Sequence, residues 1–205
     1  MAYEQLQYKV IRKYDNFELR YYERYNVAES TVSGKFNKVG NDAFRILVRY
    51  LSGNNRRKMK IPMTSPVEQS PDIGSGERIA MTTPVLQTPH GQQERESYVV
   101  RFIMPSNYTL DTLPEPEDPR ISIRQVDARF MAVRSYSGTW SEKRYRKNEA
   151  VLLQAVQTAG LTAIGEPIFA RYNPPFTLWF LRRNEVLVEV KAEEYFLKGT
   201  LINAG

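Results

Sequence analysis

The sequence predicts an α+β fold built from two similar β-α-β-β units. Two stretches, residues 41–52 and 141–159, carry the apolar spacing of amphipathic helices, and each follows a strand-like segment. Residues 27–36 also resemble residues 131–140, since both combine an alanine, a Ser-Gly pair and a final aromatic residue. Either unit alone would leave one sheet face bare, so we expect both to pack on a shared core, with a groove between them.

The first half begins with strands. Residues 8–11 and 17–21 flank a polar Asp-Asn turn, which predicts a β-hairpin, and residues 26–33 predict a third strand. The helix predicted over residues 41–52 has one apolar face and is followed by Gly53, where a C-terminal cap glycine belongs. The side chains of that apolar face are Phe44, Leu47, Val48 and Leu51.

The second helix is also set among strands. The proline-rich residues 105–119 predict a surface loop, and residues 182–185 predict a turn with solvated or paired charges. We expect the whole chain, residues 1–205, to be one domain with pseudo-repeats at about 8–125 and 126–192. Strands are predicted at residues 98–104, 121–123, 129–137, 168–172, 177–181 and 185–190.

Composition excludes several kinds of metal site. The 205 residues include no cysteine and one histidine. Disulfides, iron–sulfur clusters, thiolate ligation of haem, cysteine-based zinc sites and histidine-rich metal centres are therefore excluded. A bound cofactor must be held mainly by other side chains.

The chain is basic, with 29 lysine and arginine residues against 23 acidic residues and a formal net charge of +6. This balance favours acidic partners, but no nucleic-acid-binding motif accompanies the basic clusters at residues 56–60, 143–147 and 182–183, so we expect no nucleic acid. The N-terminus lacks the apolar core of a signal peptide, and no stretch approaches transmembrane length. We expect a soluble, cytoplasmic protein without a membrane span; the sequence leaves its oligomeric state open.

A short motif occurs twice. Residues 60–67 (KIPMTSPV) and residues 78–85 (RIAMTTPV) share the pattern basic-Ile-x-Met-Thr-x-Pro-Val. Proline has no backbone N–H, so each copy should lie on a sheet edge or end a strand there. Met63 and Met81 either pack in the core or line an apolar pocket, because methionine provides adaptable apolar surface.

Together with three other segments, this doubled motif resembles the SOUL haem-binding protein family. The segments are residues 102–106 (FIMPS), 171–176 (RYNPPF) and 182–186 (RRNEV). The resemblance implies a distorted β-barrel of two β-α-β-β repeats with a helix on each half, similar to the effector-binding domains of some bacterial regulators. It also implies that haem or another tetrapyrrole binds in a shallow apolar cleft beside the first helix.

A porphyrin needs apolar surface for its macrocycle and cations for its two propionates. The family places basic residues on the first helix near the propionates, and the matching positions here are Arg45 and Arg49. The aromatic segment at residues 172–176 is expected to close the cleft. The candidate binding residues are Phe44, Arg45, Leu47, Arg49, Met63, Met81, Tyr172, Pro175, Phe176 and Tyr21.

The resemblance leaves the axial ligand of the iron open. One branch of the family uses a histidine in a Glu-Val-Arg-His-Tyr segment, and Tyr21 stands at that position here. An ordinary tyrosine has a pKa of about 10 and needs a cation beside it, such as Arg20, to ionise. The single histidine, His90, lies in a Pro/Gly turn away from that position. The chain fits better with the second branch, which binds tetrapyrrole by packing and charge, with Tyr21 or His90 as the alternatives for metal ligation.

Three functions compete on this evidence. The first is a non-enzymatic tetrapyrrole-binding protein for haem buffering, transport or sensing, which predicts that iron-free protoporphyrin binds about as well as haem. The second is an enzyme acting on a tetrapyrrole or another planar hydrophobic molecule, with Glu185 as general acid or base because burial would raise its pKa. The third is a small-molecule effector-sensing or protein-interaction module. We favour the first, because the sequence shows no nucleophile–base pair and no metal-ligand set.

Overall fold

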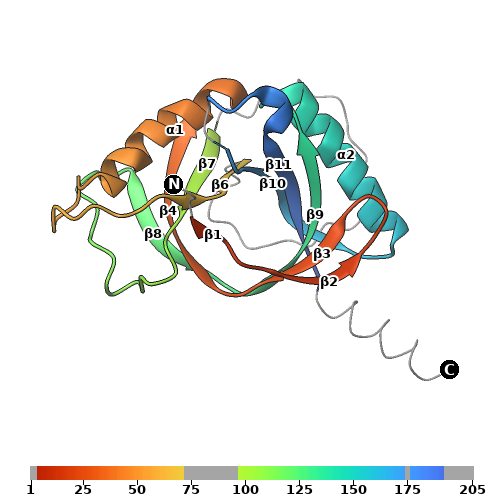
Figure 1. The fold of residues 1–205 in the computed structure, drawn as a ribbon, viewed down its shortest axis with the longest axis horizontal. Coiled ribbons are helices and arrows are strands. Elements are labelled where there is room, and N and C mark those ends of the chain that lie inside the picture. Colours follow the sequence, from red (N-terminus) through yellow and green to blue (C-terminus); the bar gives the residue numbers. More distant parts are fainter. Residues whose placement is uncertain (1–3, 72–96, 174–175, 192–205) are drawn as a thin grey trace, which may run out of the picture.

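The computed structural model describes residues 4–71, 97–173 and 176–191. Nine antiparallel strands form one sheet that curls into an open half-barrel, and two helices, α1 (Phe36–Leu51) and α2 (Glu142–Thr158), pack against it (Figure 1). The predicted α+β class is therefore confirmed. The sheet consists of β2 (Lys9–Lys13), β3 (Glu18–Tyr22), β4 (Tyr25–Ser33), β6 (Val67–Pro71), β7 (Ser97–Ile103), β8 (Ile121–Val126), β9 (Arg129–Ser137), β10 (Ala163–Arg171) and β11 (Arg183–Val190).

The order of strands across the sheet shows the duplication. It runs β2-β3-β9-β11-β10-β6-β7-β4-β8, so β9-α2-β10-β11 and β4-α1-β6-β7 lie on either side of the β10–β6 pair. Each unit also pairs with the strand that precedes the other one, since β3 pairs with β9 and β8 pairs with β4. This exchange of strands joins the two predicted β-α-β-β units into one continuous sheet.

Helix α1 begins five residues before the predicted start. Gly34 has a φ of 138°, which ends β4, and Lys35 is the N-terminal cap residue. Phe36 and Val39 are three residues apart in the first turn and are both buried, so the core extends the helix toward its N-terminus. At the other end Gly53 has a φ of 105°, which confirms its predicted place after the helix.

Two predictions near the C-terminus are wrong. Residues 177–181 form no strand; within them Trp179–Leu181 is a short 3-10 helix, η1, whose apolar side chains face outward. Residues 183–185 are not a turn, because Arg183 begins β11, which lies between β9 and β10. The charged Arg-Arg-Asn-Glu sequence resembles a solvated turn, but tertiary pairing places it in the middle of the sheet.

The core lies on both faces of the sheet. On the helix side, one cluster packs α2 over β9, β10 and β11, and a second packs α1 over β4 and β7. On the opposite face, a third cluster includes Tyr22, Tyr25, Met131 and Leu187. Successive side chains of a strand point to opposite faces, so strands such as β9 and β11 contribute to the core on both sides of the sheet.

The first copy of the doubled motif behaves as predicted. A short strand, β5 (Thr64–Ser65), ends before Pro66, and β6 begins immediately after it at Val67. β5 pairs in parallel with β1 (Glu4–Gln5) rather than with the main sheet. The second copy, with Met81, lies outside the described residues, as do His90 and Pro175. Within the described ranges, neither helix combines the length and apolarity needed to cross a bilayer.

Candidate functional site

A cleft of about 330 Å³ opens at the N-terminal half of α1, between this helix, the β5–β6 segment, the end of β10 and Trp140. The N-terminal ends of α1 and α2 lie near one another at the top of the molecule, with the residues that follow β10 between them (Figure 1). This volume is at the lower end for small-molecule sites, so a large planar ligand would be only partly enclosed. The cleft is lined by Gly40, Asn41, Phe44, Met63, Thr64, Ser65, Val67, Trp140, Arg171, Tyr172, Asn173 and Phe176.

The walls of the cleft are mainly apolar. On α1 the Phe44 ring packs edge-on against Phe102, with ring centroids 5.3 Å apart. Opposite the helix, the indole of Trp140 is held in place because its Nε1 donates a 2.8 Å hydrogen bond to Oδ1 of Asn184. Phe176, at the mouth, is 86% exposed. Such walls suit the face of a flat apolar molecule.

Arg171 brings a positive charge into this apolar cleft. Its Nη2 donates a 2.9 Å hydrogen bond to Oε1 of Gln69, and its guanidinium lies 5.2 Å from the Trp140 ring centroid and 4.9 Å from that of Phe169. Burial lowers the pKa of Arg171 to about 10. Among the described residues, no carboxylate forms an ion pair with this guanidinium. Its charge is therefore incompletely compensated, and an anion in the cleft would stabilise it.

Gly40 allows α1 to approach this guanidinium closely. A Cβ atom at residue 40 would lie 2.8 Å from Nη1 of Arg171, which is closer than side chains pack. The first turn of α1 contains no acidic residue, and its cap residue, Lys35, makes no side-chain capping hydrogen bond. The positive end of the dipole of α1 and the charge of Arg171 therefore both make the electrostatic potential in the cleft more positive.

Tyr172 connects the cleft wall to a buried polar cluster. Its hydroxyl donates a 2.6 Å hydrogen bond to Oε2 of Glu185, which is fully buried. The other oxygen of Glu185 accepts hydrogen bonds from Nη1 of Arg20 at 3.0 Å, Nη2 of Arg183 at 2.8 Å and Oγ of Ser135 at 2.8 Å. Both carboxylate oxygens are thus engaged by neighbouring donors.

The expectation that burial raises the pKa of Glu185 is wrong. Burial by itself would raise its pKa, but the charge of Arg20, the hydrogen bond from Tyr172 and the charge of Arg183 outweigh burial and hold the pKa below its ordinary value of 4.5. Burial and the adjacent Glu185 charge raise the pKa of Tyr172 well above 10. Near neutral pH the pair is therefore a carboxylate and a neutral phenol.

The structure brings together four of the predicted site residues, namely Phe44, Met63, Tyr172 and Phe176. Leu47 is not at the cleft, because it points into the core under α1 and is fully buried. Arg45 and Arg49 are exposed on α1 and do not line the cleft. Tyr21 is also absent from its lining; it lies on β3 with its ring 5.1 Å from that of Phe130.

Sequence reasoning missed Arg171, Trp140 and Gly40. Arg171 belongs to a segment on which the family resemblance rests, but the cations were expected on the first helix, at Arg45 and Arg49. Gly40 lay one residue before the predicted helix, so the helical pattern gave no sign of its close approach to Arg171. Within the described ranges, no group of three or more metal-ligating side chains is placed to hold a metal ion.

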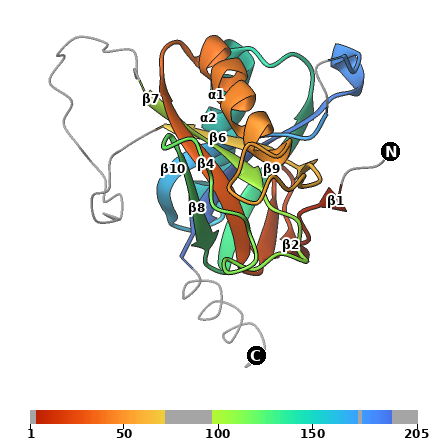
Figure 2. The ribbon, with the colours of Figure 1, turned by 90° about the vertical axis from the view of Figure 1, so that its left-hand side faces the viewer.

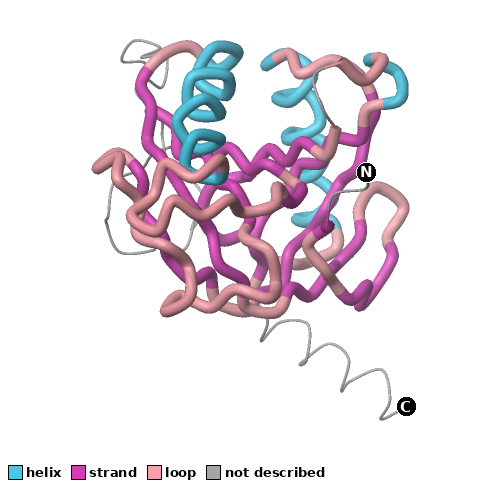
Figure 3. Tube along the Cα trace, turned by 60° about the vertical axis from the view of Figure 1, so that its left-hand side comes forward, coloured by secondary structure: helices cyan, strands magenta, loops and turns pink. Residues whose placement is uncertain are grey.

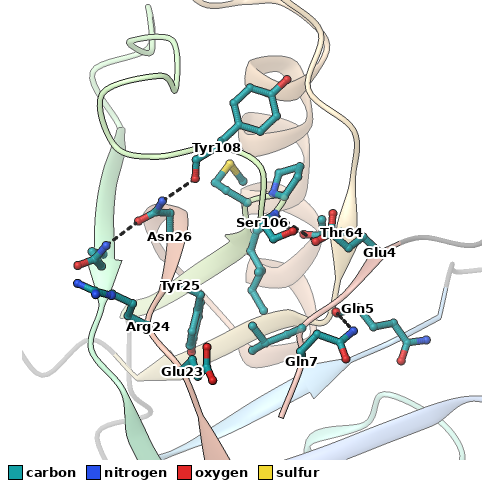
Figure 4. Close-up of a pocket in the computed structure, with 15 residues that line it drawn as sticks. Glu4, Gln5, Gln7, Glu23, Arg24, Tyr25, Asn26, Thr64, Ser106 and Tyr108 are labelled. Carbon is teal, nitrogen blue, oxygen red and sulfur yellow. Dashed lines mark hydrogen bonds between the residues drawn. The ribbon is translucent and has the colours of Figure 1, made fainter.

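A second pocket, of about 280 Å³, lies beside the N-terminal segment (Figure 4). Its rim is polar, and several of these groups bond to one another. Asn26 donates to the carbonyl of Tyr108 at 3.0 Å, and the backbone N–H of Ser106 donates to Oε1 of Glu4 at 3.1 Å. It has no buried cation like Arg171, so the apolar cleft is the better candidate for a planar anionic ligand.

Comparison with solved structures supports the fold. The C-terminal domain of EcmrR covers 90% of this chain and 98% of its own length, with a TM-score of 0.61 and 10% identity. An uncharacterized conserved protein from Listeria innocua gives a TM-score of 0.58 at 13% identity, over 86% of this chain and 92% of its own. A hydrolase from the same organism gives 0.54 at 12% identity, over 88% and 94%. At these identities the likeness shows a shared fold alone.

Comparison of sequences identifies the family. Human heme-binding protein 2 (Homo sapiens) is 24% identical over 180 residues, which span 83% of this chain and 80% of that protein. The family model described as SOUL heme-binding protein matches residues 3–189, nearly the whole chain. This match agrees with the doubled β-α-β-β sheet and with the motifs in the sequence. The chain therefore belongs to the SOUL haem-binding protein family.

Proposed function

We propose that this protein binds haem or a related tetrapyrrole in the cleft beside α1 and acts without catalysis, in buffering, transport or sensing. The observation that carries the proposal is the cation of Arg171, which pairs with no carboxylate among the described residues and lies inside a cleft whose walls are largely apolar. A tetrapyrrole has the matching chemistry, with an apolar macrocycle and carboxylate side chains. The family and its human relative, heme-binding protein 2, support the same ligand class.

Packing and charge, rather than iron ligation, would hold the ligand in the described part of the cleft. The hydroxyl of Tyr172 is committed to Glu185, and its raised pKa opposes formation of the tyrosinate that would ligate iron. The other lining residues include no histidine. We therefore propose that iron-free protoporphyrin binds about as tightly as haem, with Tyr21 and His90 tested as alternative ligands.

Two sets of cations would contribute differently. Arg171 acts at short range inside the cleft, whereas Arg45 and Arg49 are exposed on α1 and act through solvent. Salt screens exposed charges much more strongly than partly buried ones. The contribution of Arg45 and Arg49 to binding should therefore decrease at high salt, while that of Arg171 should persist.

The test is a parallel titration with hemin and protoporphyrin IX, followed by Soret absorption and tryptophan quenching. We expect saturable binding of both, weakened about tenfold or more for both by Arg171→Met. The control is Arg57→Met, which removes an exposed arginine that does not line the cleft. Circular dichroism of each variant confirms that it is folded.

Other outcomes separate the alternatives. A Soret shift that occurs with hemin, together with much weaker binding of protoporphyrin, would show that the protein ligates the iron; Tyr21→Phe and His90→Ala would then identify the ligand. Absence of saturable binding of either compound would overturn the proposal. Equal binding by wild type and Arg171→Met would place the carboxylates elsewhere.

A further inference from the structure

Five large apolar side chains protrude from the segment that joins β10 to β11. Phe176, Leu178, Trp179, Phe180 and Leu181 expose between 52% and 86% of their surface. We call residues 176–181 the apolar loop. Trp179 and Phe180 pack on each other, with ring centroids 5.6 Å apart, so the loop presents a contiguous aromatic surface. Exposed patches of this kind mark contact surfaces, because a soluble fold otherwise buries them.

The apolar loop lies at the same end of the molecule as the N-termini of both helices. It extends to one side beyond the body of the fold (Figure 2), and its helical turn stands clear of the sheet in the tube view (Figure 3). Phe176 lines the same cleft as Gly40 of α1 and Trp140, which precedes α2. Arg182, which follows the loop, lies 4.3 Å from the Trp140 ring centroid.

Four exposed cations lie at this end of the molecule, at the starts of the two helices. Lys35 and Lys38 are exposed at the start of α1, and Lys143 and Arg144 are exposed in the first turn of α2. Cations at helix N-termini add to the positive end of each helix dipole, which is unfavourable for the helices themselves. The first turn of α2 does contain one acidic residue, Glu142, but its carboxylate forms an ion pair with Arg146, at 3.5 Å from a guanidinium nitrogen. Arg144 donates a hydrogen bond to the carbonyl oxygen of Ser137, but helix stability does not explain the exposed Lys35, Lys38 and Lys143, whereas an external anionic partner would.

We propose that this end of the molecule docks on an anionic lipid bilayer. The apolar loop would enter the interfacial region, where tryptophan and phenylalanine side chains are favoured, and the flanking lysines and arginines would face the headgroups. A nucleic acid would satisfy the cations but would leave the apolar loop exposed. Because Phe176 belongs to both the loop and the cleft, the cleft mouth would lie at the membrane surface.

Flotation of the ligand-free protein with lipid vesicles tests this proposal independently of tetrapyrrole binding. We expect binding to vesicles of equimolar phosphatidylcholine and phosphatidylglycerol, weaker binding at high salt, and little binding to phosphatidylcholine alone. The double variant Trp179→Ser with Phe180→Ser should weaken binding about tenfold or more. Its control is Leu110→Ser, which removes an exposed apolar side chain from another loop.

Charge reversal tests the cations. Lys143→Glu with Arg144→Glu should also weaken binding about tenfold or more. Because it removes the hydrogen bond from Nη1 of Arg144 to the carbonyl oxygen of Ser137, circular dichroism checks that the variant is folded. The matched control, Arg57→Glu with Lys60→Glu, makes the same change of charge beyond the C-terminal end of α1, where the backbone N–H of Ile61 bonds to the carbonyl of Leu51. This control should bind vesicles more tightly than Lys143→Glu with Arg144→Glu does.

Three outcomes would overturn the proposal. Vesicle binding that is unaffected by Trp179→Ser with Phe180→Ser would show adsorption by charge without insertion. Self-association without vesicles, abolished by the same variant, would assign the loop to a second copy of the chain. Binding to duplex DNA in place of vesicles would assign the cations to nucleic acid.

Fluorescence quenching by brominated lipid tests whether Trp179 enters the bilayer. The variant Trp179→Phe keeps the loop apolar, so it should still bind vesicles but should lose most of the quenching that the wild type shows.

Discussion

The hydroxyl of Tyr172 and Oε2 of Glu185 lie 2.6 Å apart, so one side chain of the cleft wall is fixed by a carboxylate that is fully buried in the sheet. The guanidinium of Arg183 lies over the ring of Tyr172, 4.1 Å from its centroid, and also bonds to Glu185. The position of Tyr172 therefore depends on the charge balance beneath it. Changes in this cluster should alter both stability and the shape of the cleft.

Replacing Glu185 with glutamine should destabilise the protein by about 3 kcal/mol, because it leaves Arg20 and Arg183 without their shared buried anion. Urea unfolding, monitored by circular dichroism, measures the change. The matched control is Glu115→Gln, which breaks an exposed pair with Arg56 and should have little effect. An equally small effect of Glu185→Gln would show that the buried pairs contribute nothing net.

The lowered pKa of Glu185 predicts how the free energy of unfolding depends on pH. Its folded-state pKa is below its ordinary value of 4.5, so its contribution is fully present above that value and is lost as pH falls through the folded pKa. Unfolding free energy of the wild type should thus decrease below about pH 5, and its advantage over Glu185→Gln should shrink.

Asp118 also titrates in this range, because the hydrogen bond from Arg120 lowers its pKa to about 2. It lies at the surface, so salt should weaken its contribution. The comparison is therefore made between wild type and Glu185→Gln at each pH and at high salt. An advantage that does not vary with pH would contradict the assignment of a lowered pKa to Glu185.

Gly40 and Arg171 should be coupled. An alanine in the middle of a helix is normally favoured over glycine by about 1 kcal/mol. In wild type, however, the Cβ of Gly40→Ala would meet Arg171, so this substitution should give no stabilisation or a loss. In an Arg171→Ala background it should become stabilising. A double-mutant cycle by urea unfolding measures the coupling, and additive effects would contradict the close approach.

Leu47 and Phe44 should separate stability from binding. Leu47→Ala should cost about 2–5 kcal/mol of unfolding free energy, because the side chain is fully buried under α1. Its porphyrin affinity should be unchanged under conditions where it is folded. Phe44→Ala should weaken porphyrin binding more than Leu47→Ala does, because Phe44 lines the cleft. The reverse order of affinities would place the ligand elsewhere.

Local patterns in the sequence predicted the elements that have strong periodicity. The hairpin of β2 and β3, the strands β4, β7 and β9, and helix α2 were each predicted within a few residues, because their apolar spacing is continuous. The start of α1 was missed, since Gly40 weakened the helical pattern while Phe36 and Val39 stabilise the first turn by burial. The strand predicted at residues 177–181 failed because its apolar side chains face outward and pair with no strand.

The sequence by itself determined the family and the duplicated β-α-β-β pattern, and its candidates included four residues that line the cleft: Phe44, Met63, Tyr172 and Phe176. These properties depend on residue type and spacing along the chain. Only the tertiary structure decided which charges are buried and which are paired. Sheet order placed Glu185 between two arginines and left Arg171 without a carboxylate partner among the described residues, because electrostatic environment depends on neighbours that are distant in sequence.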